Sequence, residues 1–268
     1  MTTRRALLQL PLLALGPAWR AQAQLATVPD DTSRFHLFLL AGQSNMAGRG
    51  TVMPADRSPT PRVLMLDKAG AWVPAVDPMH FDKPIAGVGL GRAFAARMIE
   101  ADAAITVGLI PTAAGGSPID AWQPGGYHDQ TKSHPWDDAI ARARVALPAG
   151  TLKAILWHQG ESDATPARAA AYEAKLHALI ARFRATLDAP DVPFIVGQLG
   201  RFPDAPWDDA RQLVDAAHRA LPGKVPRTAF VSSEGLAHTG DKVHFDAASL
   251  RELGRRYADA YTSLTAAR

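Results

Sequence analysis

The sequence predicts an α/β/α sandwich with a mostly parallel, doubly wound sheet. Short, continuously apolar runs recur along the chain, as expected for strands buried on both faces of a parallel sheet. Patterns with helical spacing lie between these runs, and strands that alternate with helices are typical of doubly wound α/β proteins. A chain of 268 residues that is 47% hydrophobic can bury a full core as one domain.

The expected strands are the apolar runs, each four to six residues long. In chain order they are residues 35–40, 63–66, 105–110, 152–157, 194–199 and 228–231. In such sheets the ligand crevice lies beyond the carboxyl ends of the strands, so we expect the chemistry in the loops that follow them.

The expected helices occupy the intervening segments. Leu90, Phe94 and Met98 repeat at a spacing of four residues, which predicts one helix. A long apolar stripe over residues 172–187 predicts a second, which begins at Thr165-Pro166, a cap followed by proline.

A last helix is expected over residues 250–264, where leucines and tyrosines form one apolar stripe. Asp246 precedes it and is predicted to cap its N-terminus.

Residues 1–23 are predicted to be a signal peptide. Arg4 and Arg5 precede a short apolar run, and Ala21 and Ala23 supply a small-x-small cleavage site. An uncleaved membrane anchor is the alternative. Residues 3–8 also resemble a twin-arginine signal.

The resulting domain organisation is a signal peptide (1–23), a polar linker (24–34) and a single globular domain (35–268). We therefore expect an exported protein, periplasmic or secreted, with no membrane partner after signal cleavage.

The charge balance argues against nucleic acid as a partner. The whole chain has 29 basic and 26 acidic side chains, but residues 1–23 contain three arginines and no acid. The remainder is therefore formally neutral, and no basic run appears later in the chain. Cysteine is absent, which excludes disulfides and every cysteine-based mechanism.

Ser44 is the candidate nucleophile. It follows the first apolar run in the turn Gly42-Gln43-Ser44-Asn45. A serine hydroxyl needs a base, a group that orients the base, and donors for an oxyanion. The alternative is that Ser44 only caps the next turn.

His244 and Asp241 are the candidate base and orienting acid. A carboxylate three residues ahead of an imidazole can bind its Nδ1 and leave Nε2 facing the serine. Glu161 is a second acid that could share or replace Asp241. A metal cluster of His238, Asp241 and His244 is a further alternative, but no second ligand set accompanies it, and we predict no metal.

Four motifs occur in a fixed order along the chain: GQSNM (42–46), GGSPIDAW (115–122), WHQGESD (157–163) and DKVHF (241–245). In this order and at these separations they resemble the SGNH-hydrolase superfamily. Within it they resemble the carbohydrate acetylesterase branch that holds acetyl xylan esterases and sialate O-acetylesterase-like proteins. The similarity covers nearly the whole chain after the linker and implies a three-layer sandwich with a mostly five-stranded parallel sheet.

The resemblance also implies site residues. It gives Ser44 as nucleophile, His244 as general base and then acid, and Asp241 as the group that orients His244. The oxyanion hole would consist of backbone N–H groups of Ser44 and of Gly115 or Gly116, with the side-chain amide of Gln159. Glutamine in place of the asparagine usual in the superfamily is normal for this branch.

Supporting or substrate-binding roles are expected for Gln43, Asn45, Glu161 and Trp122. Trp122 could face a sugar or pack in the core, and Glu161 is expected to brace the Gln159 loop or to touch substrate.

Taken together, the sequence predicts an exported serine esterase that removes O-acetyl groups from a carbohydrate without a cofactor. One alternative is a lipid esterase or thioesterase of the same superfamily. The other is a carbohydrate-binding protein without activity.

Overall fold

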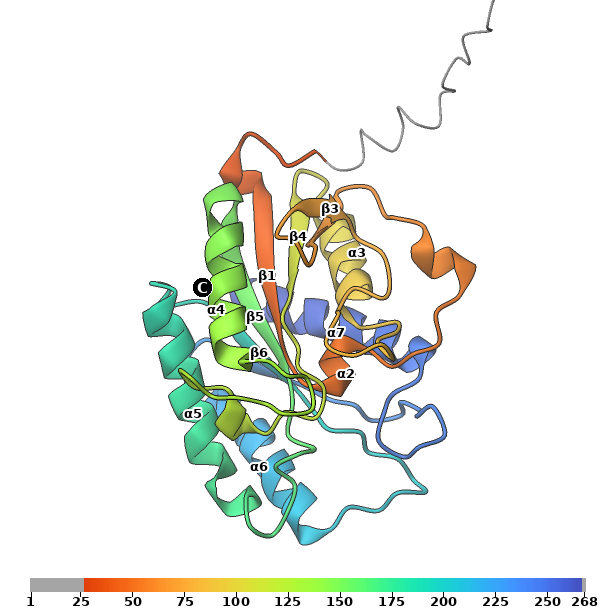
Figure 1. Ribbon diagram of the computed structural model, residues 1–268, viewed down its shortest axis with the longest axis vertical. Coiled ribbons are helices and arrows are strands. Elements are labelled where there is room, and N and C mark those ends of the chain that lie inside the picture. Colours follow the sequence, from red (N-terminus) through yellow and green to blue (C-terminus); the bar gives the residue numbers. More distant parts are fainter. Residues whose placement is uncertain (1–26, 267–268) are drawn as a thin grey trace, which may run out of the picture.

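The computed structural model describes residues 27–266, and the predicted signal peptide lies outside the described residues. A seven-stranded sheet with the order β3-β2-β4-β1-β5-β6-β7 forms the middle layer (Figure 1). The α/β sandwich is therefore confirmed, with seven strands where about five were expected. All neighbouring strands run parallel except β2 and β3.

The strands follow the apolar runs closely. Their bounds are β1 Phe35–Gly42, β2 Val63–Leu66, β3 Trp72–Pro74, β4 Thr106–Pro111, β5 Thr151–His158, β6 Phe194–Gly197 and β7 Thr228–Val231. β3 was not predicted, because Pro74 interrupts the short apolar run at residues 71–76, and a proline within such a run is typical of edge strands or of no strand at all.

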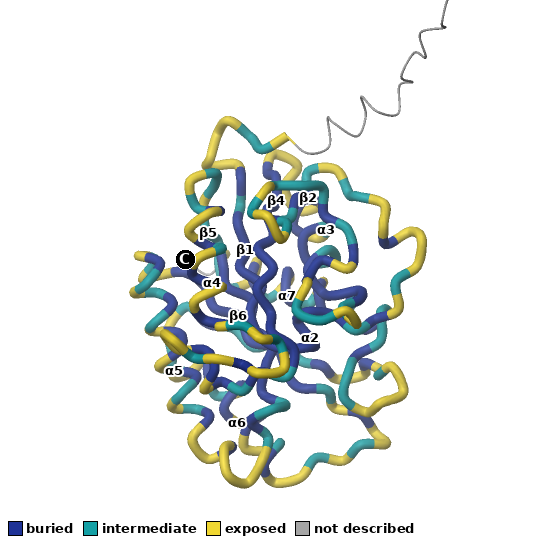
Figure 2. Tube along the Cα trace, in the orientation of Figure 1, coloured by how far each residue is buried: buried dark blue, intermediate teal, exposed yellow. Residues whose placement is uncertain are grey.

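β1 is the central strand, and its side chains supply both halves of the core. Phe35, Leu37 and Leu39 point to one face of the sheet, whereas Phe38 and Leu40 point to the other. All five are fully buried, as the dark central strands in Figure 2 show. A strand buried on both faces reads as a continuous apolar run, which is why β1 is so clear in the sequence.

Helices cover both faces of the sheet. One face carries α4 (Pro135–Ala146), α5 (Ala169–Thr186) and α6 (Asp209–Lys224), and the other carries α3 (Gly91–Ala101) and α7 (Ala247–Ala266) (Figure 1). The short helix α2 (Ser44–Ala47) follows β1 directly, and four 3-10 turns lie at Thr32–Arg34, Pro54–Arg57, Ile119–Ala121 and Leu147–Ala149.

The helix predictions are confirmed in kind but not at every boundary. Asp246 caps the last helix, since its Oδ1 accepts the backbone N–H of Ser249 at 2.8 Å. The long helix begins at Ala169 instead of Thr165, because residues 165–168 form a separate turn in which the Thr165 carbonyl accepts the N–H groups of Arg168 and Ala169. The sequence analysis did not assign α4 and α6.

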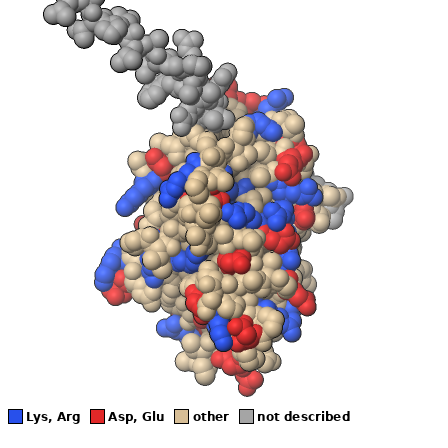
Figure 3. Space-filling model, turned by 90° about the vertical axis from the view of Figure 1, so that its right-hand side faces the viewer, with Lys and Arg blue, Asp and Glu red and all other residues tan. Residues whose placement is uncertain are grey.

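The described surface carries charges of both signs. On the face shown in Figure 3, lysine and arginine lie interspersed with aspartate and glutamate. Between residues 27 and 266 no helix is both long and apolar enough to cross a membrane.

Candidate functional site

The candidate site lies at the carboxyl ends of the central strands. β1 sits between β4 and β5, and the chain builds the β4 side of the sheet before it crosses to the β5 side. Such a change of direction separates the loops on either side of it and opens a crevice. The loops after β1, β4 and β5 carry three of the four motifs, and the fourth follows β7.

Gly42 determines how Ser44 leaves β1. Its φ is +132°, and a Cβ at this position would lie 2.1 Å from the carbonyl oxygen of His158 on β5. The next residue, Gln43, donates its backbone N–H to the same oxygen at 2.9 Å. Ser44 therefore begins α2 at a turn that only glycine permits, and its side chain is 6% exposed.

Ser44, His244 and Asp241 are hydrogen-bonded in series. His244 Nε2 lies 2.9 Å from Ser44 Oγ, across 200 residues of sequence, and His244 Nδ1 lies 2.5 Å from Asp241 Oδ2. The other carboxylate oxygen of Asp241 accepts the backbone N–H groups of Val243 and His244 at 2.9 and 2.8 Å.

These contacts fix the charge of Asp241. Partial burial alone would raise the pKa of Asp241, but the hydrogen bonds from the backbone and side chain of His244 and from the Val243 N–H lower that pKa to about 2. A carboxylate that stays ionised at Nδ1 holds the imidazole with Nε2 free to accept a proton.

Asn45 joins the Ser44 turn to the segment around His244. Its Oδ1 accepts the backbone N–H of Phe245 at 3.1 Å, and its Nδ2 donates to the carbonyl of Val243 at 3.1 Å. The same Nδ2 donates to Glu161 Oε1 at 2.6 Å. The fully buried Asn45 side chain thus binds the backbone of the residue before His244 and of the residue after it. Glu161 braces Asn45 and makes no hydrogen bond to His244.

The two glycines of the second motif differ in what their N–H groups bind. Gly115 donates to Asp82 Oδ2 at 2.9 Å, and Asp82 is also paired with Arg49 at 2.8 Å. The N–H of Gly116 has no acceptor among residues 27–266, and the same holds for the N–H of Ser44. Asp82 and Arg49 were not predicted from the sequence, because neither belongs to a motif that signals a contact with a backbone N–H.

Gln159 lies fully buried among polar partners. Its Nε2 donates to Asp163 Oδ2 at 2.6 Å, to the carbonyl of Ser117 at 3.0 Å and to Gln43 Oε1 at 3.2 Å. Tyr172 donates its hydroxyl to the Gln159 Oε1 at 3.0 Å. Both amide hydrogens of Gln159 therefore already face acceptors within the protein.

Asp163 was also missed, although it stands in the WHQGESD motif. It accepts the backbone N–H of Ile119 at 2.7 Å in addition to the Gln159 amide. Burial raises the pKa of Asp163, and the hydrogen bonds from Gln159 and Ile119 oppose that rise. Asp163 thus ties the loop after β4 to the loop after β5.

Of the two interpretations left open for Trp122, the structure agrees with packing in the core and not with a ring that faces a sugar. Its side chain is fully buried and packs edge-on against Trp157 at a centroid distance of 5.0 Å. Its Nε1 donates to Ser117 Oγ at 2.9 Å. Trp122 therefore supports the loop of Gly115 and Gly116 from within the core, where its buried ring contributes a large apolar contact area.

His238 does not join Asp241 and His244. Its Nε2 contacts both carboxylate oxygens of Asp204, at 3.1 and 3.2 Å, and its Nδ1 accepts the backbone N–H of Gly240 at 2.9 Å. Within the described part of the chain, no group of three or more histidine, aspartate or glutamate side chains is placed to hold a metal ion.

A serine bonded to an imidazole that is bonded to a carboxylate, at the crevice of a three-layer α/β/α sheet, is the arrangement of a serine hydrolase. Comparison with known proteins shows to which family the chain belongs. Residues 34–263 match the family described as carbohydrate esterase, sialic acid-specific acetylesterase, and the chain belongs to this family of carbohydrate acetylesterases. The resemblance read from the four motifs is thereby confirmed.

Known relatives agree with this assignment. The chain is 31% identical over 250 residues to a protein from Arabidopsis thaliana described as a probable carbohydrate esterase. The alignment covers 85% of this chain and 90% of the relative. A crystal structure of the same Arabidopsis protein superimposes with a TM-score of 0.74, at 30% identity over 85% of this chain and 98% of that one.

Two more distant structures share the fold. The crystal structure of NanS has a TM-score of 0.71 at 19% identity and covers 87% of this chain and 98% of its own. A carbohydrate acetylesterase from Xanthomonas citri has a TM-score of 0.67 at 21% identity and covers 87% of this chain and 57% of its own.

Proposed function

We propose that this esterase removes O-acetyl groups from a carbohydrate through a Ser44-His244-Asp241 triad and an acetyl-enzyme. The observation that carries the proposal is the series of two hydrogen bonds, 2.9 Å from Ser44 Oγ to His244 Nε2 and 2.5 Å from His244 Nδ1 to Asp241. The family supplies the substrate class.

In the first half of the reaction, His244 Nε2 takes the proton of Ser44 Oγ while Oγ attacks the acetyl carbonyl carbon. The tetrahedral intermediate collapses, the bond from the acetyl carbon to the sugar oxygen breaks, and the His244 proton passes to that oxygen. In the second half, His244 deprotonates water, hydroxide attacks the acetyl carbon, acetate leaves, and Ser44 Oγ recovers its proton. No cofactor takes part in either half.

The oxyanion would be bound by the two N–H groups that have no other acceptor within residues 27–266, those of Ser44 and Gly116. Gly115 is excluded as a donor in this arrangement because its N–H is bound to Asp82. Gln159 completes the hole by exchanging its longest contact, to Gln43 Oε1 at 3.2 Å, for the oxyanion.

Replacement of Ser44 by alanine tests the proposal. Acetate release from acetylated sugars and from 4-nitrophenyl acetate should fall to background, while circular dichroism and melting temperature stay close to those of the unaltered protein. A fluorophosphonate probe should label the unaltered protein at Ser44 and leave the variant unlabelled. Undiminished turnover by Ser44→Ala would contradict the triad.

The lipid esterase or thioesterase alternative has its own readout. A series of 4-nitrophenyl esters from acetate to octanoate should show the highest kcat/KM for acetate. A preference for octanoate would favour the alternative, and labelling at Ser44 would exclude the carbohydrate-binding protein without activity.

Export is proposed on the sequence of residues 1–23 alone. Expression of the full chain in a Gram-negative host should yield a protein that begins at Gln24, recovered from the periplasm or the medium. A cytoplasmic protein that retains Arg4 and Arg5 would contradict the signal peptide.

A further inference from the structure

A large cleft lies beside the candidate site, between the loop after β6 and the loop that leads from β7 to the triad. Its volume is about 1350 Å³. Pockets for drug-sized ligands measure roughly 300–1,000 Å³, so this cleft exceeds what one acetyl group or one small molecule needs. It is open to an extended ligand.

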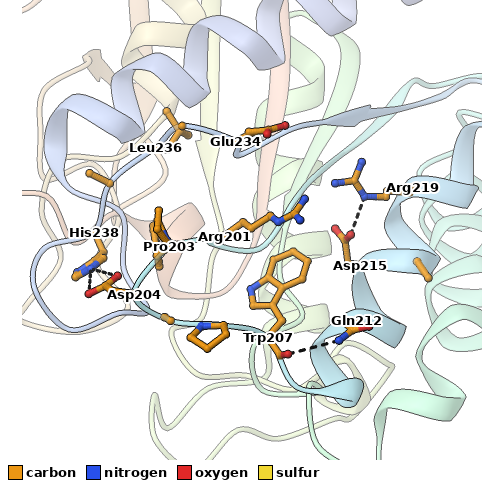
Figure 4. A pocket seen from close by; sticks show the side chains of 16 residues that line it. Arg201, Pro203, Asp204, Trp207, Gln212, Asp215, Arg219, Glu234, Leu236 and His238 are labelled. Atoms are coloured by element: carbon orange, nitrogen blue, oxygen red, sulfur yellow. Dashed lines mark hydrogen bonds and ion pairs between the residues drawn. The ribbon is translucent and has the colours of Figure 1, made fainter.

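The walls of the cleft are shown in Figure 4. Trp207 stands on the side of the β6 loop, and Glu234 and Leu236 lie on the opposite wall. The ion pair of Asp204 with His238 lies at one end, and the ion pair of Asp215 with Arg219 lies at the other.

Trp207 offers a flat apolar surface at a fixed orientation. Its Nε1 donates to the carbonyl of Gly200 at 2.9 Å, and the Arg201 guanidinium lies 5.8 Å from the ring centroid. The side chain is only partly buried. The uncovered part of a ring held in this way suits the C–H face of a sugar, which is flat and apolar while its hydroxyls project sideways.

Most of the charged side chains in the cleft form ion pairs within the protein. Asp204 is paired with His238 and Lys242, and Asp215 is paired with Arg219 at 2.7 Å. Two charged side chains remain on the walls, Arg201 and Glu234, and neither has an ion pair or side-chain hydrogen bond to another described residue.

With His238 counted as neutral, the cleft lining has two positive and three negative side chains, a formal net charge of −1: Arg201 and Arg219 against Asp204, Asp215 and Glu234. A sugar hydroxyl can accept from the Arg201 guanidinium and donate to the Glu234 carboxylate, whereas an acidic ligand would meet a lining in which negative side chains outnumber positive ones.

The cleft shares a loop with the triad. His238 lines the cleft, and its backbone pairs with Phe245, the residue after His244. Phe202, at the base of the cleft, packs against Phe245 with ring centroids 5.4 Å apart. A chain lying in the cleft therefore extends from the side of the site that His244 occupies.

We infer that this cleft is a subsite for the sugar chain of a neutral oligosaccharide or polysaccharide, whose acetylated residue is presented to Ser44. The inference rests on the proposed function for its role in catalysis, but binding in the cleft can be measured without any turnover. Trp207 supplies the stacking surface, and Arg201 and Glu234 supply the polar contacts.

Calorimetric titration of the Ser44→Ala protein with xylohexaose, which is neutral and carries no acetyl group, tests the subsite directly. Saturable binding at one site is expected. Trp207→Ala in the same background should weaken it by about tenfold or more, the loss of one stacked aromatic contact, and Trp207→Phe should retain most of it. Leu213→Ala is the matched control, because Leu213 is 51% exposed on α6 and does not line the cleft.

Three outcomes would overturn the inference: no saturable binding of xylohexaose, equal binding by Trp207→Ala, or tighter binding of hexagalacturonic acid, which is acidic. A kinetic readout separates the inference from the proposed function. In the active protein, Trp207→Ala should lower kcat/KM for acetylated xylo-oligosaccharides about tenfold more than for 4-nitrophenyl acetate. If the unaltered protein hydrolysed neither substrate, the proposed function would fail while the titration would still report on the cleft.

Discussion

Asn45 Oδ1 accepts the backbone N–H of Phe245 at 3.1 Å, and this contact joins the residue after Ser44 to the residue after His244. Together with the bond from Asn45 Nδ2 to the carbonyl of Val243, it holds the backbone on both sides of His244. The 2.9 Å distance between Ser44 and His244 thus depends on a side chain that takes part in no proton transfer.

Asn45→Ala should therefore lower kcat by about 10- to 100-fold with little change in KM, because a displacement of the histidine by a fraction of an ångström misaligns the proton transfer. Asn45→Asp should be at least as damaging, since it puts a second carboxylate against Glu161. Steady-state kinetics with 4-nitrophenyl acetate provides the measurement. A rise in KM with unchanged kcat would argue that Asn45 contacts substrate and does not position His244.

Asp241 and Glu161 should respond very differently to loss of charge. Asp241→Asn should reduce kcat by about 10²- to 10⁴-fold, because it removes the carboxylate that holds the imidazole and stabilises its charged form. The low pKa of Asp241, about 2, means that this deficit should persist at every pH above about 4. Glu161→Gln, which can still accept from Asn45, should cost far less. Equal losses in the two variants would show that Glu161 shares the acid role.

Gln159→Met should lower kcat by about 10²- to 10³-fold, the usual cost of one oxyanion donor, since methionine fills the space but donates no hydrogen bond. Melting temperatures must accompany the kinetics, because the substitution also leaves Asp163 without its amide partner. If kcat fell only a few-fold in a folded variant, Gln159 would be structural and the two backbone N–H groups would form the hole alone.

Gly42→Ala should destabilise the domain by a few kcal/mol, because its Cβ would lie 2.1 Å from the His158 carbonyl oxygen at a φ of +132°. Gly223→Ala is the matched control: this glycine lies in α6 with open space around its Cβ position and no positive φ, so alanine there should be neutral or slightly stabilising. Urea unfolding of both variants measures the difference. Comparable stability of the two would contradict the close approach of β1 and β5.

Asp77 should make the stability of the protein fall as pH rises. Burial raises the pKa of Asp77 to about 6, against an opposing effect of Arg92. Between about pH 4 and pH 6 the folded protein retains a proton that the unfolded chain releases, so the free energy of unfolding decreases over this window and is level above it.

Asp77→Asn should remove that decrease, worth about 1–3 kcal/mol. Urea unfolding of the two proteins at several pH values supplies the test, with the difference between them isolating Asp77 from other titrating groups. A difference that did not change between pH 4 and pH 6 would contradict the raised pKa.

The sequence predicted the fold class and the three residues of the proposed triad for physical reasons. Strands buried on both faces must be continuously apolar, and Ser44, Asp241 and His244 stand in loops where those runs end. A carboxylate three residues before an imidazole can bind its Nδ1, which made Asp241 the candidate orienting acid while Glu161 stayed open as the alternative.

Other parts of the site left no comparable signal. Asp82 binds a backbone N–H of Gly115, and a backbone donor has no signature in a sequence. Trp122 was open to two interpretations, because a tryptophan in a glycine-rich loop reads the same whether its ring faces a sugar or the core. β3 was missed because Pro74 interrupts its short apolar run, and the start of α5 was missed because a separate turn at residues 165–168 precedes the helix.

The length of chain between Ser44 and His244 has a consequence for folding. The two residues are 200 positions apart, and β7 joins the sheet only through β6, which joins only through β5. Contacts between distant segments form slowly, since a long loop must close before they contribute. Hydrolysis of a chromogenic acetate during refolding would therefore report the assembly of β1, β5, β6 and β7, so that regained activity is a more stringent measure of native structure than regained helix content.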